Sequence, residues 1–189
     1  MFKQLFTTLV LILTSPAKAW NTVTREESED PFMQRFFFPL LGILAVASIL
    51  GLFLSAQEFN LSLALKHCII EVSSMFGGLY LSAYLLRLIA SRFFMLDQSM
   101  PTWLQFVGYS YSACFATNIL MLFFPAIALL SLLRFYTAYI VWEGIGPFLG
   151  KLQEKEQLIL TCIALGTILL TPKIITTVLK FILPGLAVA

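Results

Sequence analysis

Charged residues are scarce in this sequence, which has 12 lysines and arginines, 10 aspartates and glutamates and one histidine among 189 residues. Charged side chains make up 12% of the chain, whereas a typical soluble domain has about a quarter. The net charge of +2 provides no basic stripe for nucleic acid. The three cysteines form no CxxC pair, which argues against a disulfide framework or a zinc site. We therefore expect no cofactor, no metal and no nucleic-acid partner.

Hydrophobic residues are abundant instead, at 59% of the chain, and the mean hydropathy is +0.90. A globule of this length cannot hide so much apolar surface, because the surface of a small protein is large relative to its volume. Lipid has to cover part of it. The sequence therefore predicts an all-α fold, a polytopic helical bundle in the membrane.

Five segments reach the roughly 20 mainly apolar residues that a spanning helix needs. They cover residues 36–56, 61–90, 104–124, 125–149 and 158–183. Asp30 and Pro31 are a start signal for the first, a capping carboxylate followed by proline at the first helical position. The fourth is interrupted by Arg134, whose long side chain is expected to reach a membrane interface. Residues 31–189 are therefore predicted to form one five-span domain.

The first 30 residues are predicted to form an amphipathic helix in the membrane interface, followed by an acidic linker. Trp20 lies where an interfacial anchor is expected, and the acidic run at residues 26–30 is interpreted as solvated. The segment also resembles a secretory signal with a cleavage site at residues 17–19; we expect it to be retained. Its apolar residues recur at helical spacing: Phe2, Leu5, Phe6, Leu9 and Leu13.

The distribution of lysine and arginine predicts the orientation, because these residues prefer the cytoplasmic side. A cytoplasmic N-terminus places the C-terminus of a five-span chain on the opposite side of a cytoplasmic (inner) membrane. The inner segments then contain Lys3, Lys18, Arg25, Arg35, Arg87, Arg92, Lys151 and Lys155. The outer segments contain only Lys66, Arg134, Lys173 and Lys180.

Polar residues within the spans are informative because each is costly in hydrocarbon unless it has a partner. In the second span His67 and Glu71 are four residues apart and share a helical face. Three polar faces of the second, third and fourth spans are expected to meet inside the bundle. The predicted network consists of His67, Glu71, Asn118, Tyr136, Tyr139 and Glu143.

Two interpretations of this network remain open. It is a structural hydrogen-bond network, or its carboxylates line a path for protons or ions. Enzyme motifs such as the G-x-S-x-G elbow, H-E-x-x-H and the Walker A loop are absent from the sequence. An enzyme is therefore not expected, and no catalytic residue is assigned.

Three stretches resemble the Yip family of five-span membrane proteins. They are residues 15–20 (SPAKAW), the opening of the third span at residues 106–110 (FVGYS) and residues 136–150 (YTAYIVWEGIGPFLG). The sequence is most similar to the bacterial branch, small proteins of unknown activity. The resemblance implies five spans and a cytoplasmic N-terminus, and it marks Gly108 and Tyr109 as motif positions with a structural role.

For eukaryotic members the resemblance implies binding of small GTPases, and in those members a long polar extension precedes the first span. This chain has only a short N-terminal region, which argues against GTPase binding. The leading functional hypothesis is a non-enzymatic membrane adaptor or organiser with the lipid bilayer and cytoplasmic proteins as partners. The alternative is a small transporter or channel with Glu71, His67 and Glu143 as its polar path.

Overall fold

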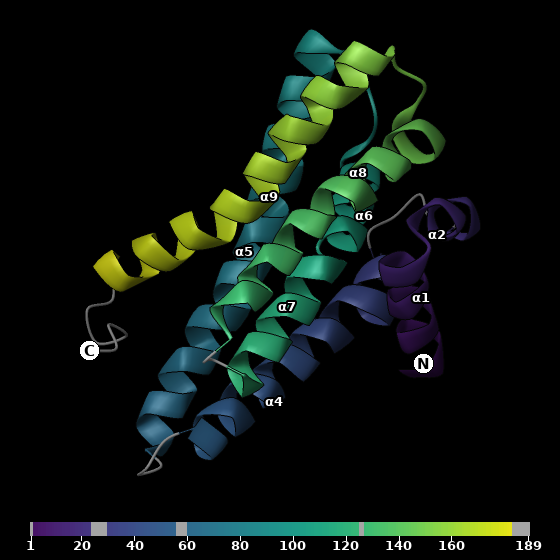
Figure 1. The fold of residues 1–189 in the computed structure, drawn as a ribbon. Coiled ribbons are helices and arrows are strands. Elements are labelled where there is room, and N and C mark those ends of the chain that lie inside the picture. The colour runs from purple at the N-terminus through teal and green to yellow at the C-terminus, as the bar shows by residue number, and fades with distance from the viewer. Residues whose placement is uncertain (1, 24–29, 56–59, 125–126, 183–189) are drawn as a thin grey trace.

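The computed structural model describes residues 2–23, 30–55, 60–124 and 127–182. Every regular element within these ranges is a helix, and no strand occurs among them (Figure 1). Large apolar side chains remain exposed along the helices, for example Leu54 at 69% and Phe181 at 88%. Such a surface suits lipid rather than water. The predicted all-α membrane bundle is therefore confirmed.

Four helical stretches within the described residues are long and apolar enough to cross a membrane: Met33–Leu54, Leu61–Phe93, Met100–Phe123 and Glu154–Ile182. The first combines the π-helical η1 (Met33–Phe37) with α4 (Phe38–Ser55), after the short α3 (Asp30–Phe32). The second is α5 (Leu61–Phe93). The third consists of α6 (Met100–Ser110) and α7 (Ser112–Phe123), and the last is α9 (Glu154–Ile182). They match the first, second, third and fifth predicted spans.

Side-chain caps determine where two of these helices begin. Asn60 caps α5, because its Oδ1 accepts hydrogen bonds from the backbone N–H groups of Ser62 at 2.9 Å and Leu63 at 3.3 Å. Ser99 caps α6 by accepting the backbone N–H of Thr102 at 3.4 Å. The proline in the first turn of α6 adds to this start signal, so the third span begins four residues before its predicted start.

The fourth predicted span is not one regular α-helix. It begins as the 3₁₀-helical η2 (Ala128–Tyr136), continues as α8 (Thr137–Gly144) and ends as the π-helical η3 (Ile145–Leu149). Pro147 has no N–H and its ring crowds the preceding turn. The Gly150 N–H accordingly binds the Ile145 carbonyl, five residues back, at 3.0 Å. This irregular segment is not among the four long apolar helices, so the count of five crossings stays a prediction.

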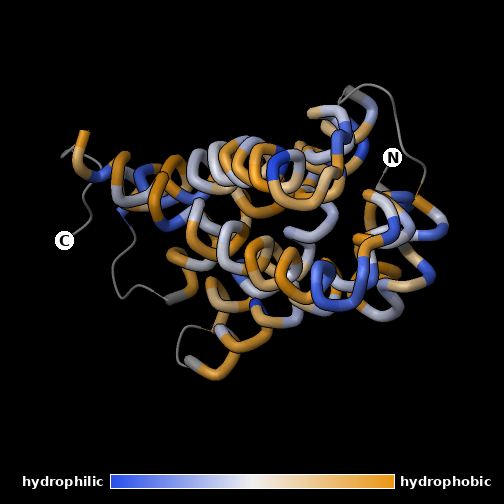
Figure 2. Tube along the Cα trace, turned by 90° about the horizontal axis from the view of Figure 1, so that it is seen from above, coloured by the Kyte–Doolittle hydropathy of each residue, from blue (hydrophilic) through white to orange (hydrophobic). Residues whose placement is uncertain are grey.

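Successive segments run in alternating directions along the bundle (Figure 1). The η2–α8 segment returns along α7, since Arg134 contacts Asn118 while Thr137, one turn further on, contacts Cys114. Seen from above, the last part of α9 projects away from the other helices (Figure 2). Thr171, just before Pro172, is 1% exposed, whereas Phe181 is 88% exposed. Proline inside a helix is a common cause of such a bend.

The N-terminal segment forms α1 (Phe2–Thr14) and α2 (Pro16–Thr22), which pack against the bundle. Some apolar side chains of α1 are buried against the bundle and others are exposed at the surface. Leu5 and Ile12 are each 1% exposed, whereas Phe6 and Val10 are half exposed. The location of α1 in a membrane interface stays a prediction. The acidic residues at 26–29 lie outside the described residues.

Candidate functional site

Trp20 connects α2 to the interior of the bundle. Its side chain is 3% exposed, and its indole N–H donates a hydrogen bond to the Ile140 carbonyl of α8 at 2.8 Å. Its ring centroid lies 5.3 Å from that of Phe106 and 5.2 Å from that of Phe148. The prediction that Trp20 is an interfacial anchor is therefore wrong, because its side chain is not exposed at the surface of the protein. The indole packs among protein side chains and satisfies its polar atom there.

Gly144 makes this position possible. A Cβ at Gly144 would lie 2.7 Å from the Nε1 and Cζ2 atoms of Trp20, closer than atoms can approach without displacement. Gly144 belongs to one of the stretches that carry the family resemblance, and Trp20 ends another. The structure thus brings two segments separated by more than 120 residues into one contact.

The motif residues Gly108 and Tyr109 lie beside this contact. A Cβ at Gly108 would lie 3.0 Å from Cε1 of Phe32 and still closer to its Cζ. The Tyr109 ring centroid is 5.0 Å from that of Phe32 and 4.7 Å from that of Phe36. The Tyr109 ring also contacts the Trp20 ring edge to face, with 6.0 Å between the ring centroids. The two motif residues therefore hold the start of the first long helix and α2 against α6.

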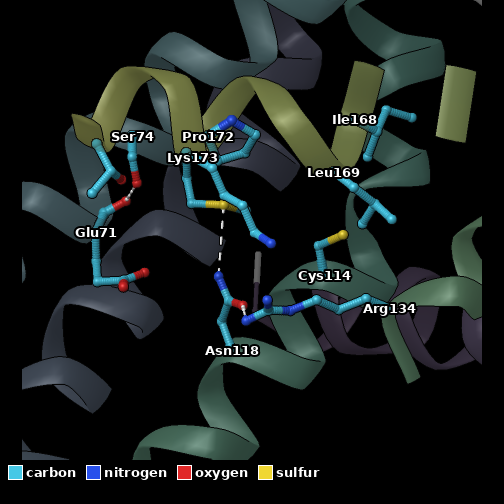
Figure 3. Close-up of a pocket in the computed structure, with 11 residues that line it drawn as sticks. Glu71, Ser74, Cys114, Asn118, Arg134, Ile168, Leu169, Pro172 and Lys173 are labelled. Atoms are coloured by element: carbon cyan, nitrogen blue, oxygen red, sulfur yellow. Dashed lines mark hydrogen bonds between the residues drawn. The ribbon is translucent and has the colours of Figure 1, made fainter. Parts of the chain in front are cut away.

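A second feature is a polar cavity of about 210 Å³ between α5, α7, η2 and α9. Its charged and polar lining comprises Glu71, Ser74, Cys114, Asn118, Arg134, Lys173 and Thr176. Figure 3 shows the Lys173 amine pointing toward the Asn118–Arg134 pair, with the Glu71 carboxylate on the other side of the same space. Three charged side chains on three different segments thus converge on one cavity.

The side chains of Asn118 and Arg134 are joined by a hydrogen bond within this lining. Nη2 of the Arg134 guanidinium donates a hydrogen bond to Asn118 Oδ1 at 2.8 Å and lies 3.6 Å from the Met121 sulfur. The Asn118 amide nitrogen lies 3.7 Å from the Met75 sulfur. That Arg134 lies near a membrane interface stays a prediction. Its guanidinium points into the bundle, where the Asn118 amide oxygen accepts its hydrogen bond.

Glu71 is the cavity's acidic group. Its carboxylate faces the same space as the side chains of Arg134 and Lys173 (Figure 3). The Ser74 hydroxyl donates to the Glu71 backbone carbonyl at 3.0 Å rather than to its carboxylate. Between the described residues no ion pair within 4 Å involves this carboxylate. Glu71 and the basic residues therefore line the same cavity without direct contact between their charged groups.

The model of the Yip1 domain matches residues 10–172 of this sequence, most of its length. The chain belongs to the Yip1 domain family. No curated protein and no solved structure gave a match. The matched range includes Trp20, Gly108, Tyr109 and Gly144, and it ends one residue before Lys173 of the cavity.

Within this Yip1 domain the cavity unites only part of the predicted network. Glu71 and Asn118 line it together. His67 lies one helical turn from Glu71, and its buried Nδ1 has no hydrogen-bond partner among the described residues. Tyr136, Tyr139 and Glu143 do not line the cavity: the two tyrosine rings pack on each other at 5.6 Å, and Tyr139 is 46% exposed.

A cluster of hydroxyl groups lies next to the cavity, further along α5 in the Yip1 domain. Ser82 Oγ is 2.6 Å from Thr171 Oγ1 and 3.2 Å from the Tyr111 hydroxyl, and Tyr111 and Thr171 are 3.1 Å apart. All three residues are at most 1% exposed. A Cβ at Gly78 would lie 3.0 Å from both the Tyr111 hydroxyl and Pro172 Cγ. The cavity is therefore closed on this side by tight packing.

Two of the three charged side chains in the lining are hydrogen-bond donors, which suits an anion. No group of three histidine, cysteine or acidic side chains that could hold a metal occurs in the part of the chain that the structure describes. Arg134 and Lys173 present only hydrogen-bond donors, and Asn118 presents both a donor and an acceptor. Lys173 was predicted only as an outer basic residue and not as part of the polar network, although its position directly after Pro172 on an apolar helix was a signal.

Proposed function

We propose that this Yip1 domain protein is a non-enzymatic membrane organiser. The bundle holds α1 against one surface of the bilayer, where α1 recruits partners or changes the shape of the membrane. The observation that supports this most directly is the buried Trp20, which fixes α2, and with it α1, to α8.

The exposure pattern of α1 supports the proposal. Leu5 and Ile12 face the bundle, while Phe6 and Val10 remain half exposed on the adjoining side. Exposed apolar residues on a helix fixed to the edge of a membrane domain can enter the boundary between headgroups and acyl chains. Helix α1 is thus oriented to insert a narrow apolar strip into one leaflet.

Charge near α1 and α2 is consistent with the cytoplasmic surface. Lys3, Lys18 and Arg35 are all exposed. Basic side chains at this position favour the cytoplasmic leaflet, both through the orientation rule and through attraction to anionic lipids. We therefore assign the N-terminus to the cytoplasmic side of an inner membrane, with the C-terminus opposite.

The alternative of a transporter or channel has weaker support. Its polar path was to include Glu71, His67 and Glu143, and Glu143 does not line the cavity. Beyond the hydroxyl cluster the buried face of α5 continues with Ala83, Leu86 and Ala90, each 0% exposed. Residues of this kind provide no partner for an ion or a proton.

The test is a double variant of the exposed strip, Phe6→Ser with Val10→Ser, compared with Thr7→Ser as a conservative control on the exposed polar side of α1. Proteoliposomes of equal protein content are measured for vesicle diameter, and cell membranes are crosslinked and examined by mass spectrometry. The double variant is expected to lose the protein-dependent change in diameter or the partner crosslinks. Unchanged diameters together with unchanged crosslinks would contradict the proposal.

A chain lacking residues 1–20 provides the second comparison. It removes α1 and the Trp20 contact together, so it should reproduce the loss seen with the double variant. Helical content from circular dichroism serves as the folding control. A deletion that affects the vesicles while the double variant does not would show that the exposed apolar strip is not the active element.

A further inference from the structure

The cavity between α5, α7, η2 and α9 carries an excess of positive charge. With all three groups ionised, Arg134 and Lys173 contribute two positive charges and Glu71 one negative charge. Charged groups in a membrane domain are costly unless they are paired. A ligand with a single negative charge would balance this lining.

Arg134 has donors available for such a ligand. A guanidinium has five N–H groups, and the bonds of Arg134 to Asn118 and Met121 both come from the same nitrogen, Nη2. No carboxylate of the described residues lies within ion-pair distance of it, whereas the amine of Lys173 points toward it across the cavity (Figure 3). A planar guanidinium with an ammonium group beside it is an arrangement that suits phosphate oxygens.

The closed side of the cavity favours binding over passage. The hydroxyl cluster of Ser82, Tyr111 and Thr171 and the close contact of Gly78 with Pro172 seal the direction toward the centre of α5. Beyond Pro172, α9 diverges from the bundle (Figure 1). A ligand could therefore enter from the side of the diverging helix but could not continue through the bundle.

We propose that this cavity binds the phosphodiester group of an anionic phospholipid. The phosphate would accept hydrogen bonds from Arg134 and Lys173, while Asn118 orients the guanidinium. A lipid is favoured over a soluble phosphate because both flanking helices expose apolar residues, Ile69 on α5 and Ile174 and Val178 on α9. These surfaces can contact the acyl chains while the headgroup enters the cavity. This site is separate from the role proposed for α1.

The experiment uses full-length protein in a neutral maltoside detergent, titrated with dioctanoyl phosphatidylglycerol and followed by native mass spectrometry. Lys173→Gln is expected to weaken binding about tenfold, since it removes one charge-assisted hydrogen bond. Lys155→Gln is the matched control, the same substitution at the other end of α9, and it should leave the affinity unchanged. Glu71→Gln is expected to strengthen binding, because it removes a repelling charge.

Arg134→Gln should also weaken binding, provided that its circular dichroism spectrum is that of the unmodified protein. Opposite effects of the Lys173 and Glu71 variants cannot come from general loss of structure, so the test does not depend on Arg134. Equal affinities of the Lys173 and Lys155 variants would overturn the proposal. Competition by glycerol 3-phosphate at concentrations equal to the lipid would overturn the assignment to a lipid in favour of a soluble phosphate.

Discussion

The contact between Trp20 and Gly144 predicts a strong energetic coupling between two distant residues. In Gly144→Ala the added methyl group would lie 2.7 Å from two atoms of the indole, so either Trp20 or α8 has to move. Overpacking of this kind costs about 1–3 kcal/mol of unfolding free energy. The displacement would also weaken the hydrogen bond from Trp20 to Ile140, which contributes about 1 kcal/mol.

The double-mutant cycle with Trp20→Ala isolates this contact. Without the indole the methyl group meets no ring, and alanine is a better helix former than glycine by about 1 kcal/mol. Gly144→Ala should therefore be neutral or slightly stabilising in the Trp20→Ala background, which gives a coupling energy of about 2 kcal/mol. Gly146→Ala is the matched control, because nothing lies within 4 Å of a Cβ at that position.

Unfolding free energies can be measured by titrating sodium dodecyl sulfate into mixed micelles. Fluorescence of Trp103, which is 0% exposed, and of Trp142 reports unfolding, because both are retained in all four proteins of the cycle. Hydrogen exchange of residues 16–22 would add a local readout, since Gly144→Ala alone should reduce their protection. If Gly144→Ala has the same effect in both backgrounds to within about 0.5 kcal/mol, the reasoning is refuted and Trp20 does not rest on Gly144.

Two further predictions concern single interactions. Asn60→Ala should lower the unfolding free energy by about 1 kcal/mol, measured by the same titration, because two backbone N–H groups of α5 lose their cap. Asn60→Ser or Asn60→Asp should retain most of the stability. An equal loss in all three variants would contradict the capping role. Tyr111→Phe should cost about 1–2 kcal/mol, since it removes a buried hydroxyl that bonds Ser82 and Thr171. Tyr84→Phe, at a residue of the same type that is 56% exposed, is the comparison outside that cluster, and equal losses would count against the cluster.

The sequence predicts the long helices because their signal is local. Apolar runs of sufficient length and a cap such as Asn60 depend only on neighbouring residues. The family resemblance was also correct, and it rested on short stretches that include Trp20 and Gly108. What these residues contact could not be predicted. The partner of Trp20 is the carbonyl of Ile140, and no local pattern indicates a contact across 120 residues.

The polar cavity was predicted in part, and the missing part has a geometric cause. Glu71 and Asn118 were assigned to facing sides of regular helices, and those helices are regular in the structure. The fourth segment was read with the α-helical rotation of about 100° per residue. Its first nine residues, Ala128–Tyr136, are 3₁₀-helical and turn by about 120° per residue.

Only three residue steps separate Arg134 from the start of α8, so the difference between the two helix types rotates Arg134 relative to α8 by about 60°. Glu143 follows Arg134 by nine residues, which is about half a turn around a regular α-helix, so the two charges lie on different sides of the segment. Arg134 enters the cavity, while Tyr139 is 46% exposed. Only one of the two charges can therefore face the cavity, and the spacing of polar residues in the sequence does not show which. With Arg134 rather than Glu143 in the lining, two basic side chains face one acidic side chain across the cavity.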